Sequence, residues 1–114
     1  MSTSKGVPGG VERRSGSNDT IILDKILKDN TFVVFYEKTC QYCVAALDEL
    51  RRKKFRYKGY EINNINLSFN QLLHIFKKQS KLEFDPRHKT VPIIFYNGKF
   101  LGGYTELINF LDKK

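Results

Sequence analysis

The chain has 114 residues, a length that fits one domain with a modest core of its own. Charged residues make up 28% and apolar residues 40%, and no window approaches 18 consecutive apolar residues, so a globular domain is expected and a transmembrane helix is not. The net charge of +8 permits contact with nucleic acid, a membrane surface or an acidic substrate, and by itself selects none of them.

The N-terminal segment differs in composition from the rest of the chain. Residues 1–18 are rich in Ser, Gly and Arg and poor in large apolar side chains, which predicts a disordered tail before a domain over 19–114. The segment lacks the apolar stretch of a secretory signal, and the chain has only two cysteines. We therefore expect a reducing compartment, the cytoplasm.

Hydrophobic spacing predicts eight elements in the order α-β-α-β-α-β-β-α. They are helix 19–29, strand 31–37, helix 44–54, strand 55–63, helix 68–80, a hairpin within 90–103 and helix 104–114, with a polar loop over 80–90. Strands separated by helices imply a mixed sheet with parallel pairs, and the hairpin adds an antiparallel edge.

Local signals support several of these elements. Ser68 and Gln71 form a capping-box pattern at a helix start, and Asn97-Gly98 is typical of a type I′ hairpin turn. The run FVVFY suits a strand buried on both faces. The side chains predicted to face the core from the second and last helices are Val44, Leu47, Leu50, Leu107, Phe110 and Leu111.

Both cysteines lie between the buried strand and the helix that follows it. Orphan N–H groups and the dipole at a helix N-terminus favour an anion at Cys40, and Lys38 adds a positive charge nearby. Cys43 lies one turn further into the helix and is expected to be more buried. These positions predict an attacking thiolate at Cys40 and a resolving thiol at Cys43.

The same residues allow other interpretations. Two nearby cysteines can be inert core residues, and a zinc site would need His74 and His88, whose spacing is not that of a zinc finger. We expect both histidines to be ordinary helix-surface and loop residues. The basic run 51–58 is most simply a solvated helix end, so neither nucleic acid nor a membrane is expected as a partner.

Three motifs together resemble the glutaredoxin family, of the dithiol type: CQYC at 40–43, TVP at 90–92 and GGYTEL at 102–107. The resemblance covers roughly residues 19–112. It implies an α/β, thioredoxin-like fold with a central four-stranded mixed sheet flanked by helices. It also implies a monomeric, glutathione-dependent thiol–disulfide oxidoreductase that reduces protein disulfides and glutathionylated proteins, with Cys40 as nucleophile and Cys43 as resolving thiol.

A glutathione site follows from the same resemblance. Its members would be Lys38, Tyr42, Lys89, Thr90, Val91, Pro92, Gly103, Tyr104, Thr105 and Glu106. Pro92 would be a cis-proline, Val91 would pair with the cysteinyl part of glutathione, and Lys89 would meet the glycyl carboxylate. Glu106 would meet the α-amino group, or be a solvated first-turn acid, and Gln71 would assist Lys89 or only cap its helix.

Gln41 stands where the family usually has proline or serine. Some members without that proline hold an iron–sulfur cluster across a dimer, ligated by the first cysteine of each protomer and by bound glutathione. A cluster ligated by Cys40 is therefore the alternative function, with glutathione as co-substrate the favoured one.

Overall fold

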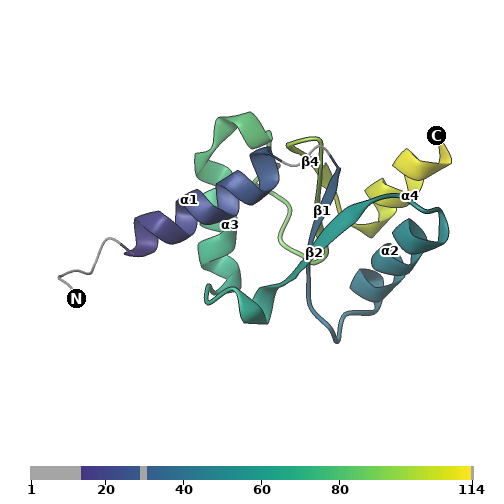
Figure 1. Ribbon diagram of the computed structural model, residues 1–114, viewed down its shortest axis with the longest axis horizontal. Coiled ribbons are helices and arrows are strands. Elements are labelled where there is room, and N and C mark those ends of the chain that lie inside the picture. Colours follow the sequence, from purple (N-terminus) through teal and green to yellow (C-terminus); the bar gives the residue numbers. More distant parts are fainter. Residues whose placement is uncertain (1–13, 29–30, 114) are drawn as a thin grey trace.

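A four-stranded mixed sheet forms the centre of the computed structural model, which describes residues 14–28 and 31–113 (Figure 1). The strands are β1 (Phe32–Tyr36), β2 (Tyr57–Glu61), β3 (Ile93–Tyr96) and β4 (Lys99–Gly102), in the spatial order β2-β1-β3-β4. β1 runs parallel to β2 and antiparallel to β3, and β3 pairs with β4 as a hairpin. The predicted mixed sheet and the predicted element order are confirmed.

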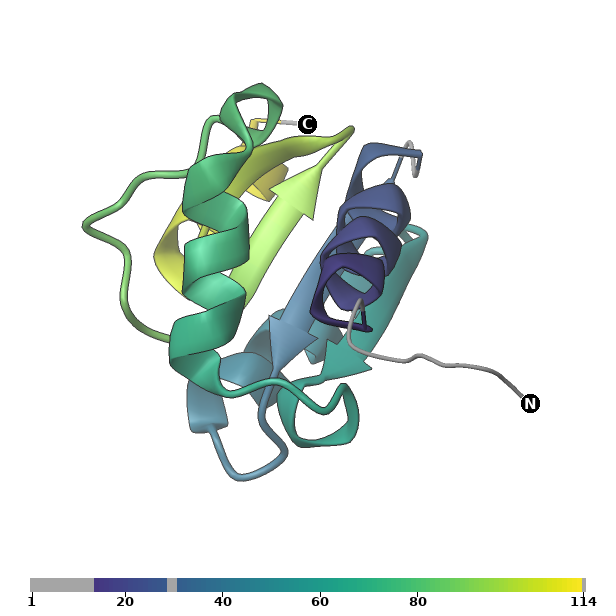
Figure 2. The same cartoon turned by 90° about the vertical axis from the view of Figure 1, so that its left-hand side faces the viewer.

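Helices cover both faces of this sheet (Figures 1 and 2). α1 (Arg14–Leu27) and α3 (Phe69–Lys78) lie on one face, and α2 (Gln41–Arg52) and α4 (Tyr104–Asp112) lie on the other. Because side chains alternate along a strand, Val33 and Phe35 point into the first core while Phe32 and Val34 point into the second. β1 is thus buried on both faces, as its sequence predicts.

The start of α1 differs from the prediction. The helix begins at Arg14 rather than near residue 19, so it takes in part of the segment expected to be a tail; residues 1–13 lie outside the described residues. Apolar spacing marks only the turns that pack against the rest of the fold. Among residues 21–28 of α1, whose side chains the structure describes, Ile22 and Ile26 are the buried ones, and their spacing is the signal that predicted this helix.

The buried face of α2 also differs from the prediction by one position. Val44 is 45% exposed, and Cys43 takes its place in a buried row with Ala46, Leu47 and Leu50. Residues three and four apart share a helix face, and the row through Cys43, Ala46, Leu47 and Leu50 leaves Val44 at its edge, adjoining only Leu47. The consequence is that one cysteine of the pair belongs to the core. In α4, Leu107 and Leu111 are buried and Phe110 packs against them, as predicted.

Caps and turns follow the local signals. Gln71 N–H donates to Ser68 Oγ and Ser68 N–H donates to Gln71 Oε1, which completes the predicted capping box of α3. Asn97 and Gly98 both have positive φ, as a type I′ turn requires. The loop expected over 80–90 contains a short 3-10 turn, Ser80–Leu82, and Leu82 is buried beneath it. Within the described ranges, no helix has the length and apolar character needed to span a membrane.

Candidate active site

Cys40 occupies the N-cap of α2, directly after the loop that leaves β1. Its backbone is extended, and its Sγ accepts a hydrogen bond from the Cys43 N–H at 3.3 Å. Its thiol also lies 3.8 Å from the Val91 carbonyl oxygen, to which it can donate. The half-buried Cys40 sulfur therefore sits between a helix N-terminus and the TVP segment, as the sequence predicts.

Cys43 is more deeply buried than Cys40. Its side chain is fully buried under α2, and both cysteines are free thiols. Burial raises the pKa of the Cys43 thiol to about 12; a backbone hydrogen bond from Glu37 opposes this rise, while the neighbouring Cys40 adds to it. The pair thus contains one reachable sulfur and one that stays protonated at neutral pH.

The TVP segment lines the other side of the Cys40 sulfur. The Val91–Pro92 peptide bond is cis, as predicted, and Pro92 is buried while Thr90 and Lys89 are exposed. The Val91 carbonyl faces Cys40, so an extended peptide lying beside the thiol would meet this backbone directly.

His88 contacts the TVP segment. Its role was not predicted from the sequence. Its ring is half-buried, its Nε2 lies 3.4 Å from the Pro92 carbonyl oxygen, and it packs edge-on against Phe84 and Phe100. A Cβ placed on Gly103 would lie 3.2 Å from the ring. The expectation of an ordinary loop residue is therefore wrong: His88 bridges the TVP and GGYTEL segments, and no periodicity or motif marks it.

The GGYTEL segment forms the entry to α4. Gly102 has φ +142°, and a Cβ there would lie 2.5 Å from both Cβ and Cγ of Glu106. Glu106 Oε1 accepts a hydrogen bond from the Gly103 N–H at 2.8 Å. Glu106 is therefore engaged in capping α4, and the missing side chain of Gly102 makes room for that cap.

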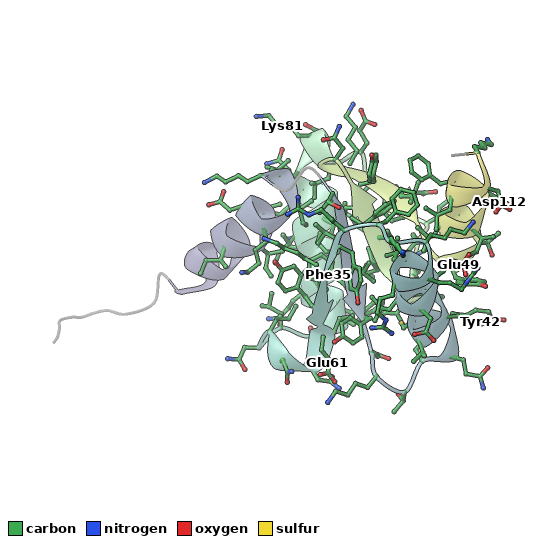
Figure 3. All side chains as sticks on the ribbon, turned by 45° about the vertical axis from the view of Figure 1, so that its right-hand side comes forward. Phe35, Tyr42, Glu49, Glu61, Lys81 and Asp112 are labelled. Carbon is green, nitrogen blue, oxygen red and sulfur yellow. The ribbon has the colours of Figure 1, made fainter. Side chains whose placement is uncertain are left out.

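Two tyrosines, one from α2 and one from α4, lie side by side. Tyr42 is 63% exposed, and its ring lies 5.7 Å from that of Tyr104 at the start of α4. Figure 3 shows Tyr42 projecting from α2 away from the sheet. Thr105 follows in the same helical turn and is also exposed. The contact between the two tyrosine rings therefore connects α2 to the N-terminus of α4.

The two basic residues predicted for the site, Lys38 and Lys89, lie in different places. The Lys38 ammonium is 3.7 Å from Glu61 Oε1, at the end of β2, which gives the lysine a partner other than Cys40. Lys89 instead joins His74 and Lys77 around a hollow of about 550 Å³ beside α3. Gln71 is committed to the capping box, which supports the second of its two predicted roles.

A metal centre built from protein side chains was the other possibility for the cysteines. Among residues 14–28 and 31–113, no group of three or more His, Cys, Asp or Glu side chains is arranged to hold an ion. What the arrangement offers is thiol chemistry: a reachable sulfur at a helix N-terminus, a buried second sulfur one turn away, and backbone placed to receive a peptide.

Known proteins share both the sequence and the fold. The glutaredoxin family model matches residues 32–101. A probable glutaredoxin of Acanthamoeba polyphaga mimivirus is 48% identical over 83 residues, which is 72% of this chain and 78% of that protein. Glutaredoxin-2 of Schizosaccharomyces pombe is 32% identical over 75% of this chain and 71% of its own length.

Solved structures agree at the level of the fold. A buckwheat glutaredoxin–glutathione complex superposes with a TM-score of 0.66 at 18% identity, over 90% of this chain and 86% of its own. Glutaredoxin 1 from Francisella tularensis, complexed with cacodylate, gives a TM-score of 0.58 at 26% identity, over 73% of this chain and 93% of its own. The neighbouring structures share the thioredoxin-like fold predicted from the motifs.

Proposed function

This chain belongs to the glutaredoxin family and is a thiol–disulfide oxidoreductase, and we propose that it takes its electrons from glutathione, with Cys40 as nucleophile and Cys43 as resolving thiol. The observation that carries the assignment is the asymmetry of the pair. Cys40 is reachable at the N-cap of α2, whereas Cys43 is fully buried with a pKa raised to about 12.

The monothiol route needs only Cys40. Its thiolate attacks the glutathionyl sulfur of a protein–glutathione mixed disulfide; the old S–S bond breaks, and the protein thiolate leaves and takes a proton from solvent. A second glutathione thiolate then attacks the glutathionyl sulfur on Cys40. Oxidised glutathione departs and the Cys40 thiolate is restored, so each glutathionylated substrate consumes one free glutathione, which leaves joined to the glutathionyl group of the substrate.

The dithiol route also uses Cys43. The Cys40 thiolate attacks one sulfur of a protein disulfide, forms a mixed disulfide and releases the other protein sulfur as a thiolate. Cys43 then loses its proton and attacks the Cys40 sulfur, which releases the second protein sulfur and leaves a Cys40–Cys43 disulfide. Two glutathione molecules reduce this disulfide in turn and leave as oxidised glutathione. Burial, the largest cause of the raised pKa of Cys43, persists when Cys40 is joined to the protein, so at pH 7 very little of Cys43 is present as thiolate. We infer that the resolving step is slower than clearance by glutathione, because its nucleophile must first be uncovered or deprotonated.

The proposed glutathione site uses the surfaces around Cys40. The Val91 backbone, beside the Cys40 sulfur, would pair with the cysteinyl unit in strand-like fashion. The N–H groups at Tyr104 and Thr105, in the first turn of α4, would hold the γ-glutamyl carboxylate. The buckwheat relative was solved as a glutathione complex, which supports a shared ligand.

The remaining predicted contacts complete this proposal. Tyr42 and Tyr104 would pack against the tripeptide, with Thr90 and Gly103 contributing backbone beside it. Lys89 would take the glycyl carboxylate at the edge of the α3 hollow. Glu106 would act mainly through its cap on Gly103, and Lys38 through its pair with Glu61 rather than by touching glutathione.

The test is reduction of a glutathionylated peptide by glutathione, coupled to glutathione reductase and NADPH. The proteins compared are wild type, Cys40→Ser and Cys43→Ser. We expect Cys40→Ser to fall to the uncatalysed rate and Cys43→Ser to keep most of the activity, because only Cys40 reacts with the mixed disulfide. An active Cys40→Ser protein with an inactive Cys43→Ser protein would reverse the assignment.

Cluster binding is the alternative use of the same sulfur. Gln41 is exposed in the first turn of α2 and does not restrict the backbone as proline would, and one thiolate per protomer is all that the chain would supply. Visible absorbance and a dimer after anaerobic purification, both lost in Cys40→Ser, would favour this alternative. We expect a colourless monomer acting in the cytoplasm.

A further inference from the structure

A second concave surface lies far from the cysteines. A hollow of about 730 Å³ opens where α1, the turn between α2 and β2, and the β2 edge of the sheet meet. We propose that this hollow, hereafter the basic groove, binds single-stranded nucleic acid. Its cationic side chains are Lys25, Lys28, Lys54, Arg56 and Lys58, and its aromatic side chains are Phe32, Phe55, Tyr57, Tyr60 and Tyr96.

The basic run 51–58 divides into two parts in the structure. Arg51 pairs with Asp48, Arg52 and Lys53 share Glu49, and Lys53 also pairs with Asp112 of α4, so the three cations of this part meet three carboxylates. Lys54 and Arg56, which follow the end of the helix, differ from these residues. Within the described part of the chain, no carboxylate lies within ion-pair distance of either side chain. A merely solvated helix end, which the sequence favoured, accounts for the first part only.

The backbone directs the second part of the run into the groove. Lys54 adopts a left-handed conformation with φ +63°, its N–H donates to the Arg51 carbonyl, and the Phe55 N–H donates to the Leu50 carbonyl. These two bonds are the Schellman pattern that ends a helix and reverses the chain. The chain then enters β2, with Arg56 and Lys58 exposed on the edge strand.

Helix α1 supplies the opposite wall and more positive charge. Lys25 lies over the Tyr60 ring, with its Nζ 5.1 Å from the ring centroid, and Lys28 pairs with Asp24 across one helical turn. Asp24 is the one carboxylate among the described lining residues, against five cations. Lysines on an edge strand also keep that strand from pairing with other chains and aggregating. That role does not explain why α1 contributes cations to the same groove.

Because the groove combines cations with aromatic rings, it suits a single strand of nucleic acid, which carries both phosphates and bases, better than a polyanion that carries no bases. Basic grooves follow the phosphates of single strands, and ring faces accept bases regardless of their identity. The aromatic side chains Phe55, Tyr57, Tyr60 and Tyr96 are half-buried in two groups: Tyr60 packs against the core under α1 and α3, and the other three pack against the core under α2 and α4, so the exposed parts of the rings line the groove from both faces of the sheet. The volume suits one or two nucleotide units.

This site is separate from the redox site. Most of the groove lies at the N-terminal ends of β1 and β2, with Tyr60 further along β2, whereas Cys40 follows the C-terminal end of β1, and neither cysteine lines the groove. Loss of nucleic-acid binding should therefore leave thiol–disulfide activity intact, and the two proposals can fail independently.

The test is fluorescence anisotropy of a labelled 12-nucleotide uridine strand with the full chain, under reducing conditions, from 50 to 200 mM salt. If three to four phosphates are neutralised, we expect affinity to fall roughly 20- to 50-fold over this range. A 12-unit abasic strand should bind at least about fivefold more weakly, because it offers no base to stack. Equal binding of the abasic strand would overturn the proposal.

Matched variants locate the site. Arg56→Ala with Lys58→Ala should lower the slope of log affinity against log salt by about 1.4 and retain peptide-reducing activity. Lys81→Ala with Lys113→Ala removes the same charge outside the groove lining and should change the slope much less. Equal losses in the two double variants, or no binding by wild type at 50 mM salt, would refute a specific groove.

Discussion

The burial of Cys43 makes the stability of the fold sensitive to alkaline pH. The pKa of this thiol is raised to about 12 in the folded chain, against 9.0 for an ordinary cysteine, chiefly by desolvation. Between pH 9 and about 12 the unfolded chain loses this proton while the folded chain keeps it. Stability falls with pH wherever the folded state binds more protons, so the contribution is complete below pH 9 and is lost as pH rises towards 12.

The magnitude follows from the size of the shift. A pKa shift of about three units corresponds to about 4 kcal/mol, lost at about 1.4 kcal/mol per pH unit inside the window. By pH 10.5 the wild type should have lost about 2 kcal/mol to this one thiol. A Cys43→Ala variant starts with lower stability, because it leaves a small cavity, but it lacks this loss.

The assay is urea unfolding of wild type, Cys43→Ala and Cys40→Ala under a reducing agent at several values from pH 7.5 to 10.5. Lysines and tyrosines titrate in all three proteins, so the wild-type minus Cys43→Ala difference isolates the buried thiol. We expect this difference in unfolding free energy to narrow by about 2 kcal/mol. Cys40→Ala should show most of the wild-type loss, because desolvation of Cys43, the largest cause of its raised pKa, remains while the smaller contribution of Cys40 is removed. A difference that stays constant with pH would refute the argument.

Three further substitutions test the surroundings of Cys40. Gly102→Ala should destabilise the fold by about 3 kcal/mol in urea unfolding, because its Cβ would collide with Glu106 and break the α4 cap; a loss below about 1 kcal/mol would contradict the predicted collision. His88→Ala should cost about 2 kcal/mol and raise KM for glutathione, with His88→Gln partly restoring both; an unchanged KM would limit His88 to packing. Lys89→Gln should raise KM for glutathione about fivefold with kcat unchanged, whereas Lys81→Gln should not, and equal effects would argue against a glycyl-carboxylate contact at Lys89.

Local signals predicted the parts of the structure that depend on neighbouring residues. The Ser68–Gln71 capping box, the Asn97-Gly98 turn and the position of Cys40 at a helix start all rest on spacings of a few residues, and the structure has each of them. The buried strand β1 was equally visible, because five consecutive apolar or aromatic residues suit a strand covered on both faces.

Features that depend on tertiary packing were not visible in the sequence. His88 has no motif, since its contacts with Phe100 and Gly103 arise only when the hairpin returns beside its loop. Lys38 looked like a partner for the thiol until the end of β2 brought Glu61 to it. The basic groove likewise forms only where α1 and β2 lie side by side. Because these elements are some 30 residues apart in the chain, no local sequence pattern predicts their contact.

The central claim is that Cys40 forms the mixed disulfide with glutathione while Cys43 stays buried and protonated. The most direct measurement is intact-protein mass spectrometry with peptide mapping, after each single variant is treated with oxidised glutathione at pH 7.5. We predict that Cys43→Ser acquires one glutathionyl group, on Cys40, and that Cys40→Ser acquires none in the same time. Rapid modification of Cys43 in Cys40→Ser, with Cys43→Ser unmodified, would contradict the account.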